Sequence, residues 1–288
     1  MAEEDIEGLW INIEKDSLFC LLGQNGAGKS TTISCITGVL PISGGDVLIY
    51  GDSITSSAGM AQIRSHMGVC PQFDILWEGL TGLEHLYLFA CIKGLHQTQI
   101  KQHSLELMER VNLREALHIR AGNYSGGMKR RLSVAIALIG DPKIVCLDEP
   151  TTGMDPVTRR HVWSVIEGAK VGRAIILTTH SMEEADILGD RIAIMARGVL
   201  RCIGTSIRLK SRFGSGYIIN VTRKRTLSSL ASPNAAISTS LVQNVAVKAF
   251  FKEHLNVTPK QENVDFIIFI VPYDKELQLP VSSLMFGV

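Results

Sequence analysis

The chain has 288 residues with a formal net charge of +1, and charged residues make up only 20% of it. This balance provides no concentrated basic face of the kind that captures nucleic acid, so we expect no nucleic-acid partner. No apolar run reaches the roughly 18–20 residues that span a bilayer. The acidic start, residues 1–5, lacks the features of a signal peptide, so we expect neither a membrane span nor a signal peptide in this chain.

The first chemical signal in chain order is a glycine-rich run between an apolar segment, residues 18–22, and a helix-forming segment. Its spacing over residues 23–30 is G-x-x-x-x-G-K-S. Glycines let backbone N–H groups cradle phosphate oxygens, and the following helix adds the positive end of its dipole. Lys29 supplies a charge for the β- and γ-phosphates and Ser30 a hydroxyl for Mg²⁺. The predicted ATP-binding residues are Gly23, Gln24, Asn25, Gly26, Ala27, Gly28, Lys29, Ser30 and Thr31.

Periodicity predicts the remaining elements. Apolar residues at helical spacing indicate helices at four places: 83–95, 100–111, 125–139 and 156–168. Alternating or continuous apolar runs indicate strands: 6–13, 46–50, 144–147, 174–177, 191–195, 199–200 and 264–271. The runs at 144–147 and 174–177 are typical of central parallel strands, which are buried on both faces and present side chains at their carboxyl ends.

The composition changes near residue 226. Residues 226–240 hold seven Ser or Thr and one Pro, which is typical of a linker or a mobile loop. We therefore expect one domain over residues 1–225 and a C-terminal segment over residues 226–288.

Two acidic residues end the predicted strand at 144–147. Asp148 beside the phosphate loop is expected to hold Mg²⁺, and Glu149 is expected to face the attacking water as a general base. The alternative is that these are two solvated acids that close a strand. The phosphate loop disfavours that alternative.

Three further positions carry weaker signals. Ser125, Gly126 and Gly127 open a predicted helix, where they could form a second anion site or an ordinary N-cap. Gln72 offers an amide to Mg²⁺ or to the water, and His180, at the end of a predicted strand, could donate to a γ-phosphate. Alone, either residue is usually an ordinary polar residue.

Taken together and in order, these motifs resemble the nucleotide-binding domain of ATP-binding cassette (ABC) transporters over about residues 6–225. Residues 23–30 look like the Walker A motif, Gln72 the Q-loop, and Ser125 to Gly127 the family signature. Asp148 and Glu149 look like the Walker B aspartate and catalytic glutamate, Asp155 the D-loop, and His180 the switch histidine. The stretches 68–72, 125–130 and 184–195 resemble the A subfamily, and within it the plant members in particular. This subfamily is associated with lipid export.

The resemblance implies a fold and a set of partners. The fold is α/β: a P-loop NTPase core with a mainly parallel sheet, a small antiparallel flank and a helical signature subdomain over about residues 73–140. ATP and Mg²⁺ are the implied cofactors, with Ser30, Gln72 and Asp148 near the metal and Glu149, His180 and Gln72 catalytic. Two cassettes bind head to tail, so Ser125, Gly126, Gly127 and Asp155 serve the partner's ATP. Transmembrane domains are implied partners, which puts the chain at the cytoplasmic face of a membrane.

The sequence also departs from the family pattern. The signature has Tyr124 and Met128 where Leu and Gln are usual, but the phosphate-facing Ser-Gly-Gly is kept. The family stacks adenine on an aromatic residue upstream of the first strand. We expect no such residue before the first strand of this chain, and we expect Trp10 to pack under the sheet instead. The tail resembles a truncated regulatory domain. Two alternatives to the transport ATPase stay open: a catalytically weak ATP-binding regulatory fragment, and a soluble ABC ATPase not tied to transport.

Overall fold

The computed structural model describes residues 6, 8–214, 216–222, 245, 247–262 and 266–271. The chain divides into two compact units, Met1–Ser206 and Ile207–Val288. This division falls earlier than the predicted boundary at residue 225, because strand β9 (Tyr217–Thr222) hydrogen-bonds to the later strand β11 (Phe266–Val271). The predicted linker at 226–240 lies outside the described residues.

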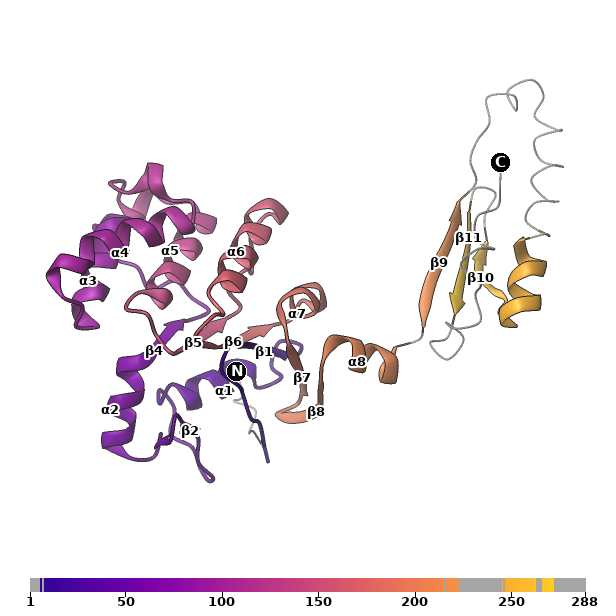
Figure 1. Cartoon of the computed structure of the whole chain (residues 1–288), viewed down its shortest axis with the longest axis horizontal. Helices are drawn as coiled ribbons and strands as arrows, with labels where there is room; N and C mark the ends of the chain where they lie inside the picture. The colour runs from indigo at the N-terminus through magenta and orange to yellow at the C-terminus, as the bar shows by residue number, and fades with distance from the viewer. Residues whose placement is uncertain are drawn as a thin grey trace, which may run out of the picture. The chain divides into compact units, whose positions relative to one another are not determined.

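The first unit is built on a six-stranded sheet with the order β4-β5-β6-β1-β7-β8 (Figure 1). Five strands run parallel, and β8 pairs antiparallel with β7. This arrangement brings the carboxyl ends of β1, β5 and β6 to one edge of the sheet. The strand bounds are β1 Ser17–Leu22, β4 Met67–Cys70, β5 Ile144–Asp148, β6 Ala174–Thr179, β7 Arg191–Ala196 and β8 Val199–Gly204.

Helices cover both faces of the sheet, which explains why its central strands are continuously apolar. Phe19 and Leu21 of β1 belong to the core shared with helices α1 (Lys29–Ile36) and α2 (Ser57–His66). The alternate residue Cys20 faces the end of α7 (Met182–Leu188), where its Cβ lies close to Gly189. Burying a side chain the size of Phe19 stabilises the fold by about 1.5–3 kcal/mol.

Three helices with short 3₁₀ turns between them lie within residues 73–140. The first, α3, begins with a capping box: Thr81 Oγ1 accepts from the N–H of Glu84, and the Glu84 carboxylate accepts from the N–H of Thr81 at 2.7 Å. A two-stranded antiparallel ribbon is separate from the main sheet. The bounds of these elements are α3 Gly82–Ile92, α4 Gln97–Arg110, η1 Arg114–Ala116, η2 Ala121–Asn123, α5 Gly126–Leu138, β2 Leu48–Ile49 and β3 Asp52–Ser53.

The second unit contains a three-stranded antiparallel sheet of order β10-β11-β9, with β10 at Pro259–Glu262. Residues 247–255 are helical and pack on one face of this sheet, where the rings of Phe251 and Phe269 stack at 4.0 Å. A short helix, α8 (Ser206–Phe213), begins at the division between the two units.

The predicted fold class is confirmed, and so are the four predicted helices, of which α6 spans Pro156–Gly168. The strand predicted at 6–13 is wrong. Its described residues pair with no neighbouring strand, although Ile11 and Ile13 pack against the core. Trp10, which the sequence places under the sheet, is instead 90% exposed, because the residues that pack against the core are Ile11 and Ile13, which alternate in direction with Trp10. None of the helices in the described part of the chain is both long enough and apolar enough to cross a bilayer.

Candidate nucleotide-binding site

The phosphate loop connects β1 to α1 and has the backbone that its glycines permit. Gly26 and Gly28 have φ of 82° and 94°, a region that other residues rarely adopt. Gly23 is required for a different reason: a Cβ there would lie 2.6 Å from the carbonyl oxygen of Met195 in β7. The loop is also held from behind, since the N–H of Gly198 donates to the carbonyl of Ala27 at 3.2 Å. The glycines therefore allow a close turn that β7 and its following turn support.

Lys29 is the first residue of α1 and is almost fully buried. Its ammonium donates to the carbonyls of Gly23 and Gln24 at 2.9 and 3.1 Å, and it lies 3.4 Å from Glu149 Oε1. The lysine charge thus lies across the mouth of the loop, between the loop carbonyls and the tip of β5. A buried ammonium at this point favours a bound anion.

Ser30 and Asp148 meet at the carboxyl end of β5, where Ser30 Oγ donates to Asp148 Oδ1 at 3.1 Å. Thr178, at the end of the neighbouring strand β6, donates its hydroxyl to the same carboxylate oxygen. The set is a hydroxyl and a carboxylate of the kind that Mg²⁺ prefers, with a second hydroxyl that orients the carboxylate. The structure therefore brings together the two strand ends that the sequence predicted.

Glu149 follows Asp148 in a strained turn with φ of 48°. Its N–H donates to both the side-chain oxygen and the carbonyl of Thr178, at 3.0 and 3.1 Å. Its carboxylate accepts from Thr152 Oγ1 at 3.1 Å and lies 3.2 Å from His180 Nδ1. Burial raises the pKa of Glu149, but Lys29 and these two hydrogen bonds outweigh that effect, and the pKa lies below its usual value. Glu149 is therefore a fixed carboxylate at neutral pH.

The signature residues open α5 as predicted. Ser125 is the N-cap and its hydroxyl accepts from the N–H of Met128 at 3.3 Å, while Ser125 and Gly126 are exposed. A Cβ at Gly126 would meet no atom within 4 Å. Among the hydrogen bonds of the described residues, none joins residues 125–127 to the phosphate loop. This exposed helix start is free to face a second molecule.

Two other predicted residues stand apart from the phosphate loop. Gln72 is exposed, and among the described contacts its side chain bonds to neither Asp148 nor Glu149. Asp155 caps α6, where its carboxylate accepts from the N–H of Thr158 at 2.9 Å, and this bond lowers its pKa below the usual value.

Three polar residues that contact Asp148 or Glu149 were not predicted from the sequence: Thr178, Thr152 and Arg130 of α5. The pair Thr178-Thr179 at the end of an apolar strand carries the same signal that pointed to Asp148 and Glu149. Arg130 has no such signal, because its partners, backbone carbonyls and one carboxylate, belong to segments distant in the sequence.

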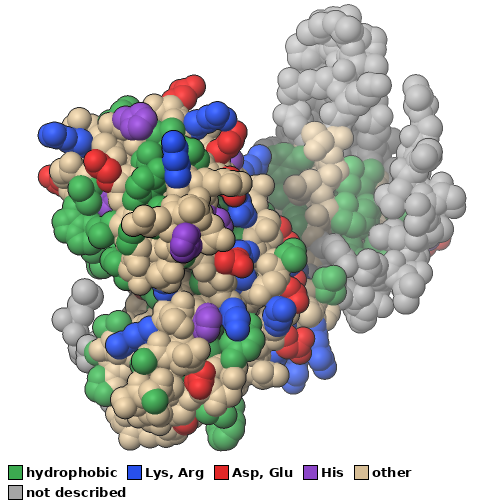
Figure 2. All heavy atoms as spheres, turned by 60° about the vertical axis from the view of Figure 1, so that its left-hand side comes forward, with side chains coloured by type: hydrophobic (Ala, Val, Ile, Leu, Met, Phe, Trp, Pro, Cys, Tyr) green, Lys and Arg blue, Asp and Glu red, His purple; other side chains and the backbone are tan. Residues whose placement is uncertain are grey.

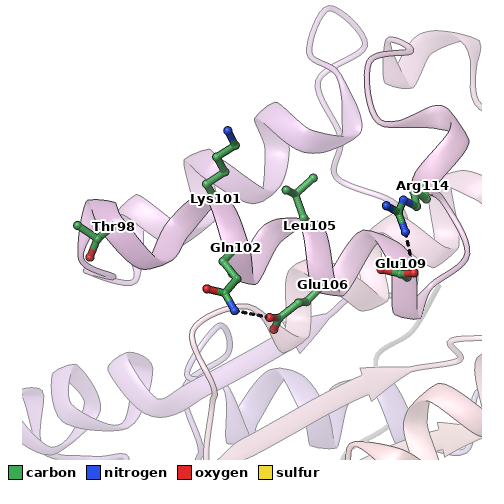
Figure 3. A pocket seen from close by; sticks show the side chains of 7 residues that line it. All are labelled: Thr98, Lys101, Gln102, Leu105, Glu106, Glu109 and Arg114. Atoms are coloured by element: carbon green, nitrogen blue, oxygen red, sulfur yellow. Dashed lines mark hydrogen bonds and ion pairs between the residues drawn. The ribbon is translucent and has the colours of Figure 1, made fainter.

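A surface hollow of about 380 Å³ lies elsewhere, on the outer side of α4 (Figure 3). Figure 3 shows Glu109 paired with Arg114 at one end and Gln102 donating to Glu106 near its centre. None of the predicted site residues lines this hollow, whose lining is Thr98, Lys101, Gln102, Leu105, Glu106, Glu109 and Arg114.

A glycine-rich loop at the carboxyl edge of a parallel sheet, with a lysine and a hydroxyl facing an acidic strand end, defines a P-loop nucleotide-binding domain. The family model described as ABC transporter matches residues 6–152, and the chain belongs to that family as an ATPase domain. The resemblance drawn from the motifs is thus confirmed.

Individual relatives agree with this assignment. ABC transporter A family member 11 from Arabidopsis thaliana is 62% identical over 271 residues, which cover 94% of this chain and 28% of the relative. The phospholipid-transporting ATPase ABCA3 of Mus musculus is 45% identical over 219 residues, which cover 76% of this chain and 13% of that protein. A dimeric ATP-binding cassette, MJ0796, solved with ADP and Pi, has the same fold with a TM-score of 0.64 at 23% identity, covering 69% of this chain and 90% of that one. The matched part of this chain thus spans less than a third of the length of either curated relative.

Proposed function

We propose that this chain is the ATP-binding and ATP-hydrolysing module of a membrane transporter of the ABC A subfamily. One observation carries the proposal: Lys29, Asp148 and Glu149 converge at the mouth of the phosphate loop, with Lys29 3.4 Å from Glu149 and Ser30 3.1 Å from Asp148. Binding, metal and base functions thus meet where the terminal phosphate of ATP would lie. A catalytically silent module would not need this full set.

The donor chemistry fits Mg²⁺ together with ATP. Ser30 and Asp148 offer only oxygen atoms, and Mg²⁺ is typically bound by one or two protein oxygens plus phosphate oxygens and water. Bound there, the ion would neutralise charge that develops on the phosphates. Residues 23–31 would hold the phosphates through their N–H groups, with Lys29 as the balancing cation.

Glu149 would accept the proton of the attacking water, and His180 would hold the terminal phosphate and the water in line. The lowered pKa of Glu149 keeps the carboxylate ionised and ready to accept this proton at neutral pH. Its turn is fixed by the two bonds from its N–H to Thr178, so the base is held in position before ATP arrives.

A second cassette would complete each ATP site. Ser125, Gly126 and Gly127 form an exposed helix start that can bind an anion of another molecule, and exposed Asp155 opens the helix after the D-loop. The matching cassette MJ0796 is itself a dimer bound to ADP and Pi, which supports pairing of two cassettes here. ATP binding would draw the two cassettes together, and hydrolysis would release them.

Transmembrane domains are the proposed partners that this movement drives. Phe73, Ile75 and Trp77 are 78, 68 and 50% exposed in the segment that follows Gln72, and Ile92 on α3 is 66% exposed. Exposed apolar residues gathered in one segment are typical of a protein contact. On the face that Figure 2 shows, Lys and Arg lie among Asp and Glu without forming a continuous basic area, so this view gives no support to a nucleic-acid partner.

The proposed cargo class is lipid, and the proposed place of action is the cytoplasmic face of a membrane. The support is the activity for which the mouse relative is named, that of a phospholipid-transporting ATPase.

The test is Mg²⁺-dependent ATP hydrolysis by the purified chain over a range of protein concentrations, beside Glu149→Gln. We expect turnover to rise more than linearly with protein concentration, since two chains form each site. Glu149→Gln should bind ATP, lose turnover and accumulate as an ATP-bound dimer. Equal hydrolysis by the variant and the parent would overturn the general-base assignment.

A matched variant tests the pairing. Ser125→Arg should leave ATP binding by the single chain unchanged, because Ser125 serves the partner's nucleotide, and should prevent the dimer. Loss of ATP binding by the single chain would contradict the action in trans.

A further inference from the structure

Arg130 of α5 lies five residues after the signature serine and is 5% exposed. Its guanidinium reaches the segment that carries the proposed base. Nε donates to the carbonyl of Pro150 at 3.1 Å, and one terminal nitrogen donates to the carbonyl of Glu149 at 3.0 Å and to that of Asp148. Three successive carbonyls at the end of β5 therefore bond to one side chain.

The other terminal nitrogen of Arg130 reaches a second segment. It donates to the carbonyl of Pro71, directly before Gln72, and lies 3.3 Å from Asp74 Oδ1. Asp74 also accepts from Ser133 Oγ of the same helix at 2.9 Å. The guanidinium thus joins α5, the end of β5 and the Gln72 segment, which are far apart in the sequence.

Removing a cation from water is costly, and its attraction to carbonyl dipoles and to one carboxylate offsets that cost only when the geometry is good. A planar guanidinium presents several N–H groups in a fixed fork, which a lysine ammonium cannot reproduce. The carbonyls that it binds include that of Glu149, whose φ of 48° is strained for a residue with a side chain. The contacts therefore hold a turn that the backbone alone would not favour.

We propose that Arg130 is a positioning residue for ATP hydrolysis: it fixes Glu149 relative to the helix that begins at Ser125. This inference rests on the proposed function, in which Ser125 serves the partner's ATP and Glu149 serves the chain's own. In a head-to-tail dimer, Arg130 then makes the signature of one ATP site and the base of the other move together. The bond from Arg130 to the carbonyl of Pro71 also fixes the segment of Gln72 relative to α5 and to the end of β5.

The chain provides a matched control in the next residue. Arg131 also binds backbone carbonyls, those of Val111 at 3.0 Å, Asn112 at 2.7 Å and Gly127 at 3.4 Å. None of its carbonyl contacts reaches residues 148–150. Replacing Arg131 removes a similar number of bonds from the same helix and leaves the end of β5 intact.

The experiment compares Arg130→Lys with Arg131→Lys in the full chain, and measures kcat, KM for ATP and thermal unfolding. For Arg130→Lys we expect kcat to fall by about 10- to 100-fold with KM changed less than about 3-fold, because misplacing a catalytic group by about 1 Å has that effect on the rate. Arg131→Lys should keep kcat within about 3-fold of the parent. An equal loss of kcat in both variants would overturn the proposal, because it would show that Arg130 only stabilises α5.

A double-mutant cycle with Glu149→Gln separates positioning from general damage. If Arg130 acts through Glu149, Arg130→Lys should lower the residual turnover of Glu149→Gln by less than about 2-fold. A further loss as large as in the parent background would overturn the proposal. Equal turnover by the parent and Glu149→Gln would instead contradict the proposed function.

Amide hydrogen exchange gives a readout that does not depend on turnover. Residues 148–152 should exchange faster in Arg130→Lys than in the parent, and Arg131→Lys should leave them unchanged. Unchanged exchange at residues 148–152 in Arg130→Lys would also overturn the proposal.

Discussion

Replacing Thr178 with valine removes one hydroxyl from the centre of the site while keeping the shape of a fully buried side chain. The hydroxyl donates to the Asp148 carboxylate and accepts from the N–H of Glu149 at 3.0 Å. A hydrogen bond to a charged group contributes about 1.5–3 kcal/mol. The N–H of Glu149 keeps a second acceptor, the carbonyl of Thr178 at 3.1 Å. Losing the bond from this N–H to the Thr178 hydroxyl therefore adds little to the destabilisation. We therefore expect Thr178→Val to destabilise the chain by about 2–3 kcal/mol.

For a unit of about this size, each kcal/mol shifts the melting temperature by about 2–4 °C, so the expected decrease is about 4–12 °C. The assay is thermal and urea unfolding followed by circular dichroism. Thr179→Val is the matched control, since Thr179 is also buried and, among the contacts of the described residues, its hydroxyl accepts only the N–H of Ser181 at 3.0 Å, a bond of about 1 kcal/mol. The reasoning is refuted if Thr178→Val is no less stable than Thr179→Val.

Three further predictions follow from the same geometry. Gly23→Ala should weaken ATP binding at least about 10-fold, measured by fluorescent-nucleotide titration, because its Cβ would lie 2.6 Å from the Met195 carbonyl. Glu184→Leu should destabilise the chain in urea by about 2–4 kcal/mol, because this buried carboxylate accepts from two buried donors, a hydroxyl and an indole N–H, that would lose their partner. The free energy of unfolding of the parent should exceed that of Glu149→Gln by a constant amount above the ordinary pKa of 4.5. This difference should be lost as the pH falls further, because the folded state lowers the pKa of Glu149.

Simple controls accompany these three. Gly44→Ala should leave ATP binding unchanged, since a Cβ at Gly44 would meet no atom within 4 Å. Glu183→Leu removes an exposed carboxylate from the same helix and should cost less than about 0.5 kcal/mol. An advantage of the parent over Glu149→Gln that grew as the pH fell through 4.5 would contradict the direction of the pKa shift.

The sequence predicted most of the fold because its signals are local. The glycine spacing over residues 23–30 and the apolar runs ending at Asp148 and Thr179 are each contained within a few residues, and parallel strands bring their ends together. The predicted roles of Glu149 and Ser125 stay predictions, although the structure brings Glu149 to Lys29.

The errors and omissions depend on tertiary contacts. The apolar alternation of residues 6–13 does not reveal that this segment lacks a pairing partner among the described strands. Ile11 and Ile13 pack against the core, whereas Trp10 points into solvent. Arg130 looked like any basic residue on a helix, because nothing near it in the sequence reveals that it binds carbonyls 18–20 and 59 residues away.

The position of β1 in the sheet has a consequence for how the chain is made. β1 pairs only with β6 and β7 among the described strands, and its register joins Ser17 to Ala174 and Phe19 to Arg191. At a synthesis rate of about 5–20 residues per second, the strand leading into the phosphate loop waits roughly 10–30 s for either partner. During that interval an apolar strand has two unpaired edges, and closing such long loops slows folding. The phosphate loop is therefore synthesised well before the later strands that complete the nucleotide site around it.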